Sequence, residues 1–211
     1  MKKILIVIIL YANCIFNIEP IYAQCNNWTQ KANFGGTGRY GAIGFSIGSK
    51  GYIGTGNSMG FNNQDFWEYD TTSNTWTQKA NFGGSARDLA VGFSIGSKGY
   101  IGTGSDGVTL YQDFWEYDTT TNIWTQKANF GGTERFWAVG FSIGSKGYIG
   151  TGLGGPFTLK YDDFWEYDPI LDTWTQKANV GGGTRDVAVG FSIGNKGYIG
   201  TGAWPRKRDF W

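Results

Sequence analysis

One nine-residue sequence recurs four times along the chain and limits the possible folds more than any other feature. WTQKANFGG begins at Trp28, Trp76 and Trp124, and WTQKANVGG begins at Trp174, so the spacings are 48, 48 and 50 residues. The segments AxGFSIG and KGYIGTG recur with the same period. A repeat of this length is typical of propellers and solenoids, in which each unit buries a face against its neighbour.

Each repeat contains the patterns of two β-hairpins. In the first repeat, 42–47 and 50–56 are joined by Gly-Ser, a two-residue link that suits a hairpin turn. Residues 65–70 and 75–80 are joined by Thr-Thr-Ser-Asn, the short polar residues expected in a tight loop. The sequence therefore predicts an all-β fold with four-stranded antiparallel sheets.

The second predicted strand indicates how these sheets stack. Alternation along 50–56 places Tyr52, Gly54 and Gly56 on one face. We expect the glycines to let a neighbouring sheet approach closely, while Tyr52 and two tryptophans supply bulk farther from the axis. Small residues inside and large ones outside suit the wedge-shaped blades of a β-propeller.

The repeat resembles the kelch family, and in particular secreted bacterial kelch proteins whose repeats are nearly identical. The matching residues are Arg87 at the start of a strand, Gly102 and Gly104, the run DFWEYD at 113–118, and Trp124 at the end of the unit. The chain departs from the family where adjacent glycines are replaced by Gly-Thr-Gly. The resemblance covers residues 28–211 and implies a propeller, but the family includes both enzymes and binding modules.

The repeat boundaries leave two architectures open. The predicted blades are 39–80, 87–128, 135–178 and 185–211, the last completed by 28–32. Pairing between 28–32 and the last unit would close a four-bladed ring. Because the last unit lacks the Glu-Tyr-Asp of the others, we expect instead an incomplete ring, part of a kelch propeller with six or seven blades.

Residues 1–23 have the pattern of a signal peptide. Lys2 and Lys3 precede an apolar run over 4–16, and the small residue Ala23 stands at the end of the segment, as at a signal-peptide cleavage site. The mature chain should therefore begin at Gln24. The run is shorter than the roughly twenty apolar residues that a spanning helix needs. We expect a secreted protein, extracellular or periplasmic, with no membrane insertion after cleavage.

The composition excludes several function classes. Removal of 1–23 leaves equal numbers of basic and acidic residues, which argues against nucleic acid as a partner, because such binding needs clustered Lys and Arg. The chain has no histidine, the commonest metal ligand and general base. Cys25 is the one cysteine left after cleavage, so no intramolecular disulfide is expected. We expect no metal and no cofactor.

One arginine precedes the first strand of each repeat. Four guanidinium groups at equivalent positions could surround a channel mouth and hold a carboxylate or phosphate. The interpretation that we favour is structural, with each arginine bonded to a carbonyl or an aspartate of the adjacent blade. The residues are Arg39, Arg87, Arg135 and Arg185.

Three carboxylates recur on each third strand, and we interpret them as structural. An acid–base pair needs two groups in different environments, whereas Asp65, Glu68 and Asp70 have equivalents in the later repeats. We expect the aspartates to bond turns and the glutamates to face solvent or lysine.

Sequence differences between the repeats gather in two places, around each arginine and between the second and third strands. In an antiparallel blade both segments lie on the same face of the propeller, where aromatic residues are suitable anchors for a sugar ring or a protein. Neutral drift in loops is the alternative explanation. The predicted ligand-binding residues are Tyr40, Phe61, Tyr111, Phe136, Trp137, Phe157, Tyr161 and Trp204.

These patterns predict a secreted or cell-surface module that binds a protein or glycan or acts as a scaffold, without catalytic activity. The alternative is a metal-free carbohydrate-active enzyme on the same scaffold, either a sugar isomerase or mutarotase, or a hydrolase.

Overall fold

The computed structural model describes residues 27–155, 158–203 and 205–211. Ala32–Trp211 is one compact unit, and Met1–Lys31 is a separate one. The predicted signal peptide lies outside the described residues. Residues 27–34 contain no strand, so the pairing of 28–32 with the last blade stays a prediction. Within the described ranges, no helix has the length and apolar character to cross a membrane.

The first three repeats form four-stranded antiparallel sheets, as predicted. Blade 1 consists of β1 (Ile43–Ile47), β2 (Lys50–Gly54), β5 (Phe66–Asp70) and β6 (Thr75–Gln78). Blade 2 consists of β7 (Val91–Ile95), β8 (Lys98–Gly102), β9 (Phe114–Asp118) and β10 (Ile123–Lys127). Blade 3 consists of β11 (Val139–Ile143), β12 (Lys146–Gly150), β15 (Phe164–Asp168) and β16 (Thr173–Lys177).

The fourth repeat forms a smaller sheet, blade 4. Its two strands are β17 (Val189–Ile193) and β18 (Lys196–Gly200). A third segment pairs with β18, because the backbone N–H groups of Ile199 and Trp211 each donate to the carbonyl of the other, at 3.0 and 2.9 Å.

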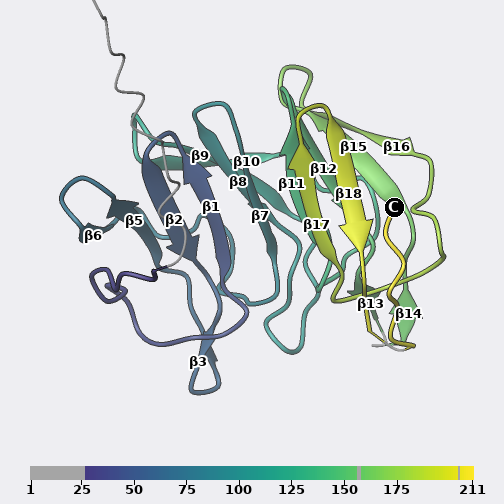
Figure 1. Cartoon of the computed structure of the whole chain (residues 1–211), viewed down its shortest axis with the longest axis horizontal. Helices are drawn as coiled ribbons and strands as arrows, with labels where there is room; N and C mark the ends of the chain where they lie inside the picture. Colours follow the sequence, from purple (N-terminus) through teal and green to yellow (C-terminus); the bar gives the residue numbers. More distant parts are fainter. Residues whose placement is uncertain (1–26, 156–157, 204) are drawn as a thin grey trace, which may run out of the picture. The chain divides into compact units, whose positions relative to one another are not determined.

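The inner strands β1, β7, β11 and β17 lie next to one another in this order (Figure 1). The two ends of the series, β1 and β17, are not neighbours. The four blades therefore form an arc, and the inner edge of the arc follows the sequence from purple to yellow in Figure 1.

The second strand ends earlier than its sequence pattern predicts. β2 stops at Gly54 because Thr55 and Gly56 take left-handed backbone conformations, with φ values of 57° and 90°. Thr103, Thr151 and Thr201 repeat the feature. A threonine therefore occupies a conformation that usually favours glycine, at the point where the chain leaves the blade.

Glycine does bring the blades together. Of the two predicted positions, Gly56 contacts the next blade, because its N–H donates to Arg87 O at 2.8 Å, but Gly54 does not. A β-carbon on Gly92 would lie 2.8 Å from Cβ of Ile43, and one on Gly99 would lie 2.5 Å from the ring of Phe45 in the preceding blade. Gly54 instead lies under the ring of Phe66 in its own blade. The close side-chain packing between blades thus depends on the glycines of AxGFSIG and KGY.

Aromatic side chains fill the outer part of each interface between blades. The ring of Phe66 meets Tyr117 and Trp124 of the next blade edge-on, with centroid distances of 4.9 and 5.0 Å. Phe114 repeats the arrangement with Tyr167 and Trp174. Such pairs contribute about 0.5–1.5 kcal/mol beyond the area that they bury.

Candidate functional site

The two sets of variable segments lie on one face of the arc, as predicted. In every repeat the residue after the arginine forms a β-bridge with the segment that follows the second strand: Tyr40 with Asn57, Asp88 with Ser105, Phe136 with Leu153, and Asp186 with Ala203. Two short hairpins extend these segments, β3 (Asn57–Ser58) with β4 (Phe61–Asn62), and β13 (Leu153–Gly154) with β14 (Leu159–Lys160). We call this surface the loop face; it is the lower side of Figure 1.

A buried ion pair fixes the base of the loop face in each blade. Arg87 is 0% exposed, and its two Nη atoms donate to both carboxylate oxygens of Asp113. Its Nε and Nη1 atoms also donate to the carbonyls of Ser85 and Thr103, at 2.9 and 3.0 Å. The Asp113 carboxylate accepts a further hydrogen bond, from the indole of Trp115 at 2.8 Å.

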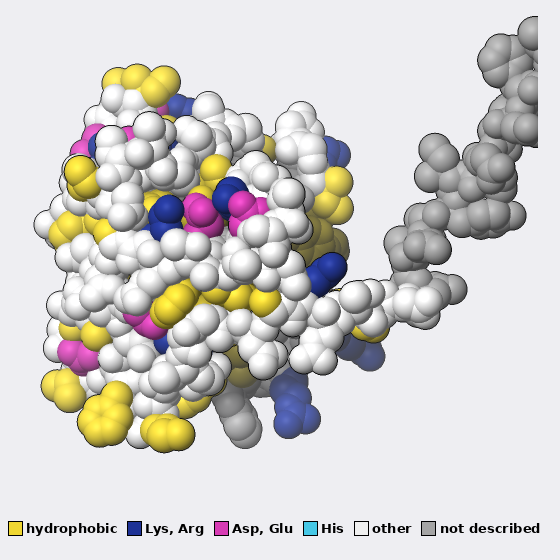
Figure 2. Space-filling view, turned by 90° about the vertical axis from the view of Figure 1, so that its left-hand side faces the viewer, with side chains coloured by type: hydrophobic (Ala, Val, Ile, Leu, Met, Phe, Trp, Pro, Cys, Tyr) yellow, Lys and Arg dark blue, Asp and Glu magenta, His cyan; other side chains and the backbone are white. Residues whose placement is uncertain are grey.

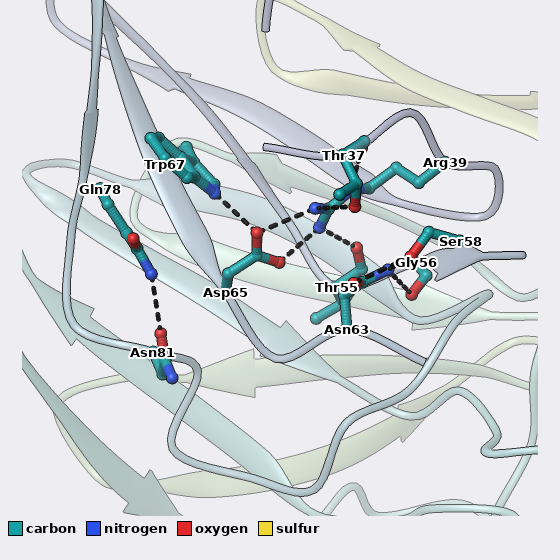
Figure 3. Close-up of polar contacts among 10 residues, drawn as sticks. All are labelled: Thr37, Arg39, Thr55, Gly56, Ser58, Asn63, Asp65, Trp67, Gln78 and Asn81. Carbon is teal, nitrogen blue, oxygen red and sulfur yellow. Dashed lines mark hydrogen bonds and ion pairs between the residues drawn. The ribbon is translucent and has the colours of Figure 1, made fainter. Parts of the chain in front are cut away.

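Figure 3 shows the same arrangement in blade 1, where Asp65 lies between Arg39 and Trp67. Burial disfavours the charged form of Asp65, but the bonds from Arg39 and Trp67 hold the pKa of this carboxyl below its usual range. The geometry does not support the anion site that we considered for the four arginines, because their guanidinium groups are buried and each holds a carboxylate of the chain. It supports the favoured structural interpretation, with one correction: each aspartate belongs to the arginine's own blade, not to the adjacent one.

Several of the predicted aromatic anchors are part of the scaffold. The ring of Tyr111 lies 3.8 Å from the guanidinium carbon of Arg87, and the ring of Tyr161 lies 4.0 Å from that of Arg135. Phe136 is buried against Trp137. The buried Phe136 is therefore corrected to a structural role, whereas Tyr111 and Tyr161 are half-buried and also cover the arginines.

Three of the predicted anchors are open to solvent. Tyr40 is 63% exposed, Phe61 77% and Trp137 38%. Phe157 and Trp204 lie outside the described residues. Three aliphatic residues, which an aromatic pattern does not reveal, add to this surface: Met59, Val108 and Leu159 are exposed on the same loops. Figure 2 shows hydrophobic side chains along the lower edge of the molecule.

A shallow apolar depression of about 220 Å³ lies at the centre of the loop face. It is lined by the second and third residues after each arginine, which carry no charge: Gly41, Ala42, Leu89, Ala90, Trp137, Ala138, Val187 and Ala188. The four repeats contribute different side chains at the first of these positions. The depression is thus asymmetric although the blades beneath it are nearly identical.

Backbone hydrogen bonds connect the lining residues from blade to blade. The N–H group of Leu89 donates to Gly41 O at 2.8 Å, that of Trp137 to Leu89 O at 3.2 Å, and that of Val187 to Trp137 O at 3.2 Å. All four residues are left-handed, with φ between 52° and 63°. This conformation costs non-glycine residues about 1–3 kcal/mol each, and the surrounding blades hold it.

The carboxylates of the third strand have the structural roles that the sequence predicts, with one difference. Asp70 Oδ1 accepts the N–H groups of Thr72 and Ser73 in the turn. Glu68 contacts Lys50 and Lys79 and also accepts the hydroxyl of Tyr52 at 2.7 Å. The first aspartate of each run bonds the arginine rather than a turn. Among the described residues, no cluster of acidic or cysteine side chains could hold a metal ion.

Two further acids at the rim of the depression have different surroundings. A β-carbon on Gly41 would lie 3.2 Å from Cβ of Asp88. Burial raises the pKa of the Asp88 carboxyl. Asp186, its equivalent in blade 4, forms an ion pair with Lys160 at 2.8 Å. The sequence does not reveal this difference, because the partner, Lys160, belongs to another blade.

Comparison with known proteins places the fold. The chain is similar to a solved structure described as "Structure of YjhT", a kelch-type propeller, with 19% sequence identity and a TM-score of 0.67. The fold is a β-propeller. The match covers 78% of this chain and 57% of that chain, so the likeness extends to little more than half of the neighbour's length. No family model and no curated protein matches the chain.

Proposed function

We propose that the chain is a binding module that takes up its ligand on the loop face. The proposal rests on one observation, that the charged groups and the exposed apolar groups of each repeat lie in different places. The recurrent charged groups are engaged in the Arg–Asp pairs, turns and lysine contacts of the blades, whereas the apolar groups of the loop face are exposed around an asymmetric depression. Exposed apolar surface of this kind commonly marks an interaction site.

The chemistry of the depression favours a neutral ligand group. Its lining has no charged side chain, and the exposed aromatics Tyr40, Phe61 and Trp137 lie on the same face. Aromatic rings can stack on the apolar face of a sugar or anchor an apolar side chain of a protein. A glycan or a protein is therefore the ligand class that we propose.

A combined glycan and protein array tests the proposal. The purified chain should bind a defined set of ligands, and Trp137→Ala and Tyr40→Ala should each weaken that binding. Ile170→Ala is the matched control, because Ile170 is an exposed apolar residue in the turn between β15 and β16, on the opposite face. Unchanged binding by both loop-face variants would contradict the assignment.

We also propose that the protein is exported, on the basis of the pattern at 1–23. Expression of the full chain with its own N-terminus, followed by N-terminal sequencing of the exported product, should give a chain that begins at Gln24. Retention of the uncleaved chain in the cytoplasm would contradict export.

A second candidate function is sugar isomerisation, mutarotation or hydrolysis, and Asp88 is the specific observation in its favour. Asp88, with a raised pKa, and its ion-paired equivalent Asp186 two blades away differ in the way that acid–base catalysis uses. Turnover of reducing sugars or glycosides that disappears in Asp88→Asn, with ligand binding retained, would support this candidate. No turnover across both substrate panels would exclude it.

A further inference from the structure

Two aspartates occupy equivalent positions on the loop face but differ in their partners. Asp88 and Asp186 each follow the arginine of their repeat, and they are 8% and 2% exposed. Lys160 Nζ forms an ion pair with Oδ1 of Asp186 at 2.8 Å. The Asp88 carboxylate has no hydrogen bond or ion pair to another residue of the described ranges. A nearly buried carboxylate without a cation is unfavourable, so this difference requires an explanation.

Lys160 shows how the loop face holds an ammonium group. Besides the ion pair with Asp186, its Nζ atom donates to the carbonyl of Ala203 at 2.7 Å. Asp186 and Ala203 are opposite each other in a β-bridge. A carboxylate and the carbonyl of its bridge partner therefore act together as two acceptors for one ammonium group, and hydrogen bonds of this charged kind are among the stronger ones in proteins.

Blade 2 has the same two acceptors. Asp88 forms a β-bridge with Ser105, as Asp186 does with Ala203. The backbone N–H group of Asp88 donates to the Ser105 carbonyl at 2.9 Å, and a carbonyl oxygen has a second lone pair for another donor. The bridge in blade 2 thus offers an ammonium group the pair of acceptors that blade 4 offers to Lys160.

The lysine that pairs with blade 4 comes from the hairpin of the preceding blade, and the equivalent hairpin of blade 1 has no lysine. Lys160 pairs with Leu153 in β13–β14, and Asn62 pairs with Asn57 in β3–β4; both hairpins lie on the lower side of Figure 1. Leu153 and Asn57 are the bridge partners of the residue after the arginine, so Asn62 is the equivalent of Lys160. The Asn62 amide oxygen accepts a bond from Asn57 at 3.0 Å. Blade 1 therefore supplies a neutral group where blade 3 supplies a cation.

The boundary between blades 2 and 3 shows the same two positions occupied by apolar residues. They are Leu110, which is bridged to Ser105, and Phe136, which is 5% exposed. A β-carbon on Gly155 of blade 3 would lie 3.8 Å from Cδ1 of Leu110, so this position does face the next blade. The three boundaries thus combine Lys with Asp, Leu with Phe, and Asn with Asp. The third combination leaves a carboxylate without the cation that the first supplies.

We propose that Asp88 and the Ser105 carbonyl bind the ammonium group of a lysine side chain in a protein ligand. The inference rests on the proposed binding function and specifies one contact of that ligand. Lysine is the residue that the chain itself places at the equivalent site. Leu89, the next residue after Asp88, lines the apolar depression, and a lysine stem packs on apolar surface while its charged head reaches a polar partner. The neutral group in the depression and the ammonium group at its rim are then parts of one ligand.

A titration of the isotope-labelled full chain with the peptide acetyl-Leu-Lys-Leu-amide, followed by NMR in an amine-free buffer, tests the proposal. The peptide should shift the amide resonances of Asp88 and Ser105. The analogue with norleucine in place of lysine should bind about 10- to 150-fold more weakly, because it loses hydrogen bonds to a charged group. Asp88→Asn should weaken binding of the lysine peptide by a similar factor and keep the fold, because the Asp88 carboxylate bonds no other described residue.

A second variant fills the site from within the chain. Asn62→Lys should place an ammonium group at Asp88, as Lys160 does at Asp186, and should prevent binding of the peptide. Asn62→Gln is the matched control, because it keeps a neutral amide, and it should bind the peptide like the wild type. Equal inhibition by the two variants would contradict a site for an ammonium group.

The outcomes separate this contact from the proposed function. Equal binding of the lysine and norleucine peptides, or no binding of either at the highest soluble concentration, would overturn the proposal. Array ligands that lose affinity with Trp137→Ala but keep it with Asp88→Asn would also overturn it, while the loop-face function would stand. Glucosamine oligomers that bind in place of the peptide and are lost with Asp88→Asn would overturn the choice of a protein ligand. An array without any ligand would overturn the proposed function instead.

Discussion

Asp113 holds the buried guanidinium of Arg87, and its replacement by asparagine tests whether the Arg–Asp pairs stabilise the blades. The carboxylate accepts two bonds from Arg87 and one from Trp115. Asparagine keeps one acceptor oxygen and directs its NH₂ group toward the guanidinium. Loss of a partner in a buried ion pair costs about 3–5 kcal/mol, and loss of two hydrogen bonds to a charged group, at about 1.5–3 kcal/mol each, gives a similar value.

Urea denaturation followed by tryptophan fluorescence measures this loss. A decrease of about 3–5 kcal/mol is a large part of the 5–15 kcal/mol typical of a folded domain. Asp118→Asn is the matched control on the same strand, because Asp118 pairs with Lys98 at the surface and its turn bonds can be made by an asparagine oxygen. Equal losses for the two variants, or a loss below about 1 kcal/mol for Asp113→Asn, would refute a stabilising role for the buried pair.

Three further predictions concern pH and packing. Hydrogen bonds from Lys50 and Lys98 lower the pKa values of Asp70 and Asp118 to about 2. The midpoint of urea denaturation should therefore be constant near neutral pH and decrease as pH falls from about 4 to 2. A midpoint that stays constant down to about pH 2 would contradict this. Burial raises the pKa values of Tyr117 and Tyr148 to about 12, so stability should also decrease as pH rises from about 10 to 12, and tyrosinate absorbance at 295 nm should appear together with unfolding rather than before it. Gly92→Ala should lower the free energy of unfolding, measured by urea denaturation, by about 1–3 kcal/mol, because its Cβ would collide with Ile43. Gly44→Ala should be tolerated, because its Cβ would meet only an ordinary contact. Similar losses for the two variants would show that the glycines do not govern blade contact.

The repeat predicted the blades, and local residue patterns predicted their hairpins, because both depend on short-range alternation and turn chemistry. The positions of the glycines that contact other blades could not be read from one strand, since Gly54 lies under Phe66 of its own blade whereas Gly92 lies against Ile43 of the preceding blade. Sequence alone also could not separate Tyr111, which covers Arg87, from Tyr40, which is exposed. That difference arises from a contact between residues distant in the chain.

Hydrogen exchange of the chain, free and bound to the strongest glycan or protein ligand from the array, tests the central claim most directly. Binding at the loop face predicts slower amide exchange in the segments that precede the four inner strands, where Leu89, Trp137 and Val187 form backbone bonds from blade to blade. Exchange in the Gly-Ser turns and in the turns after Asp70, Asp118 and Asp168 should stay unchanged. Protection confined to those turns, with none around Trp137, would contradict a binding site on the loop face.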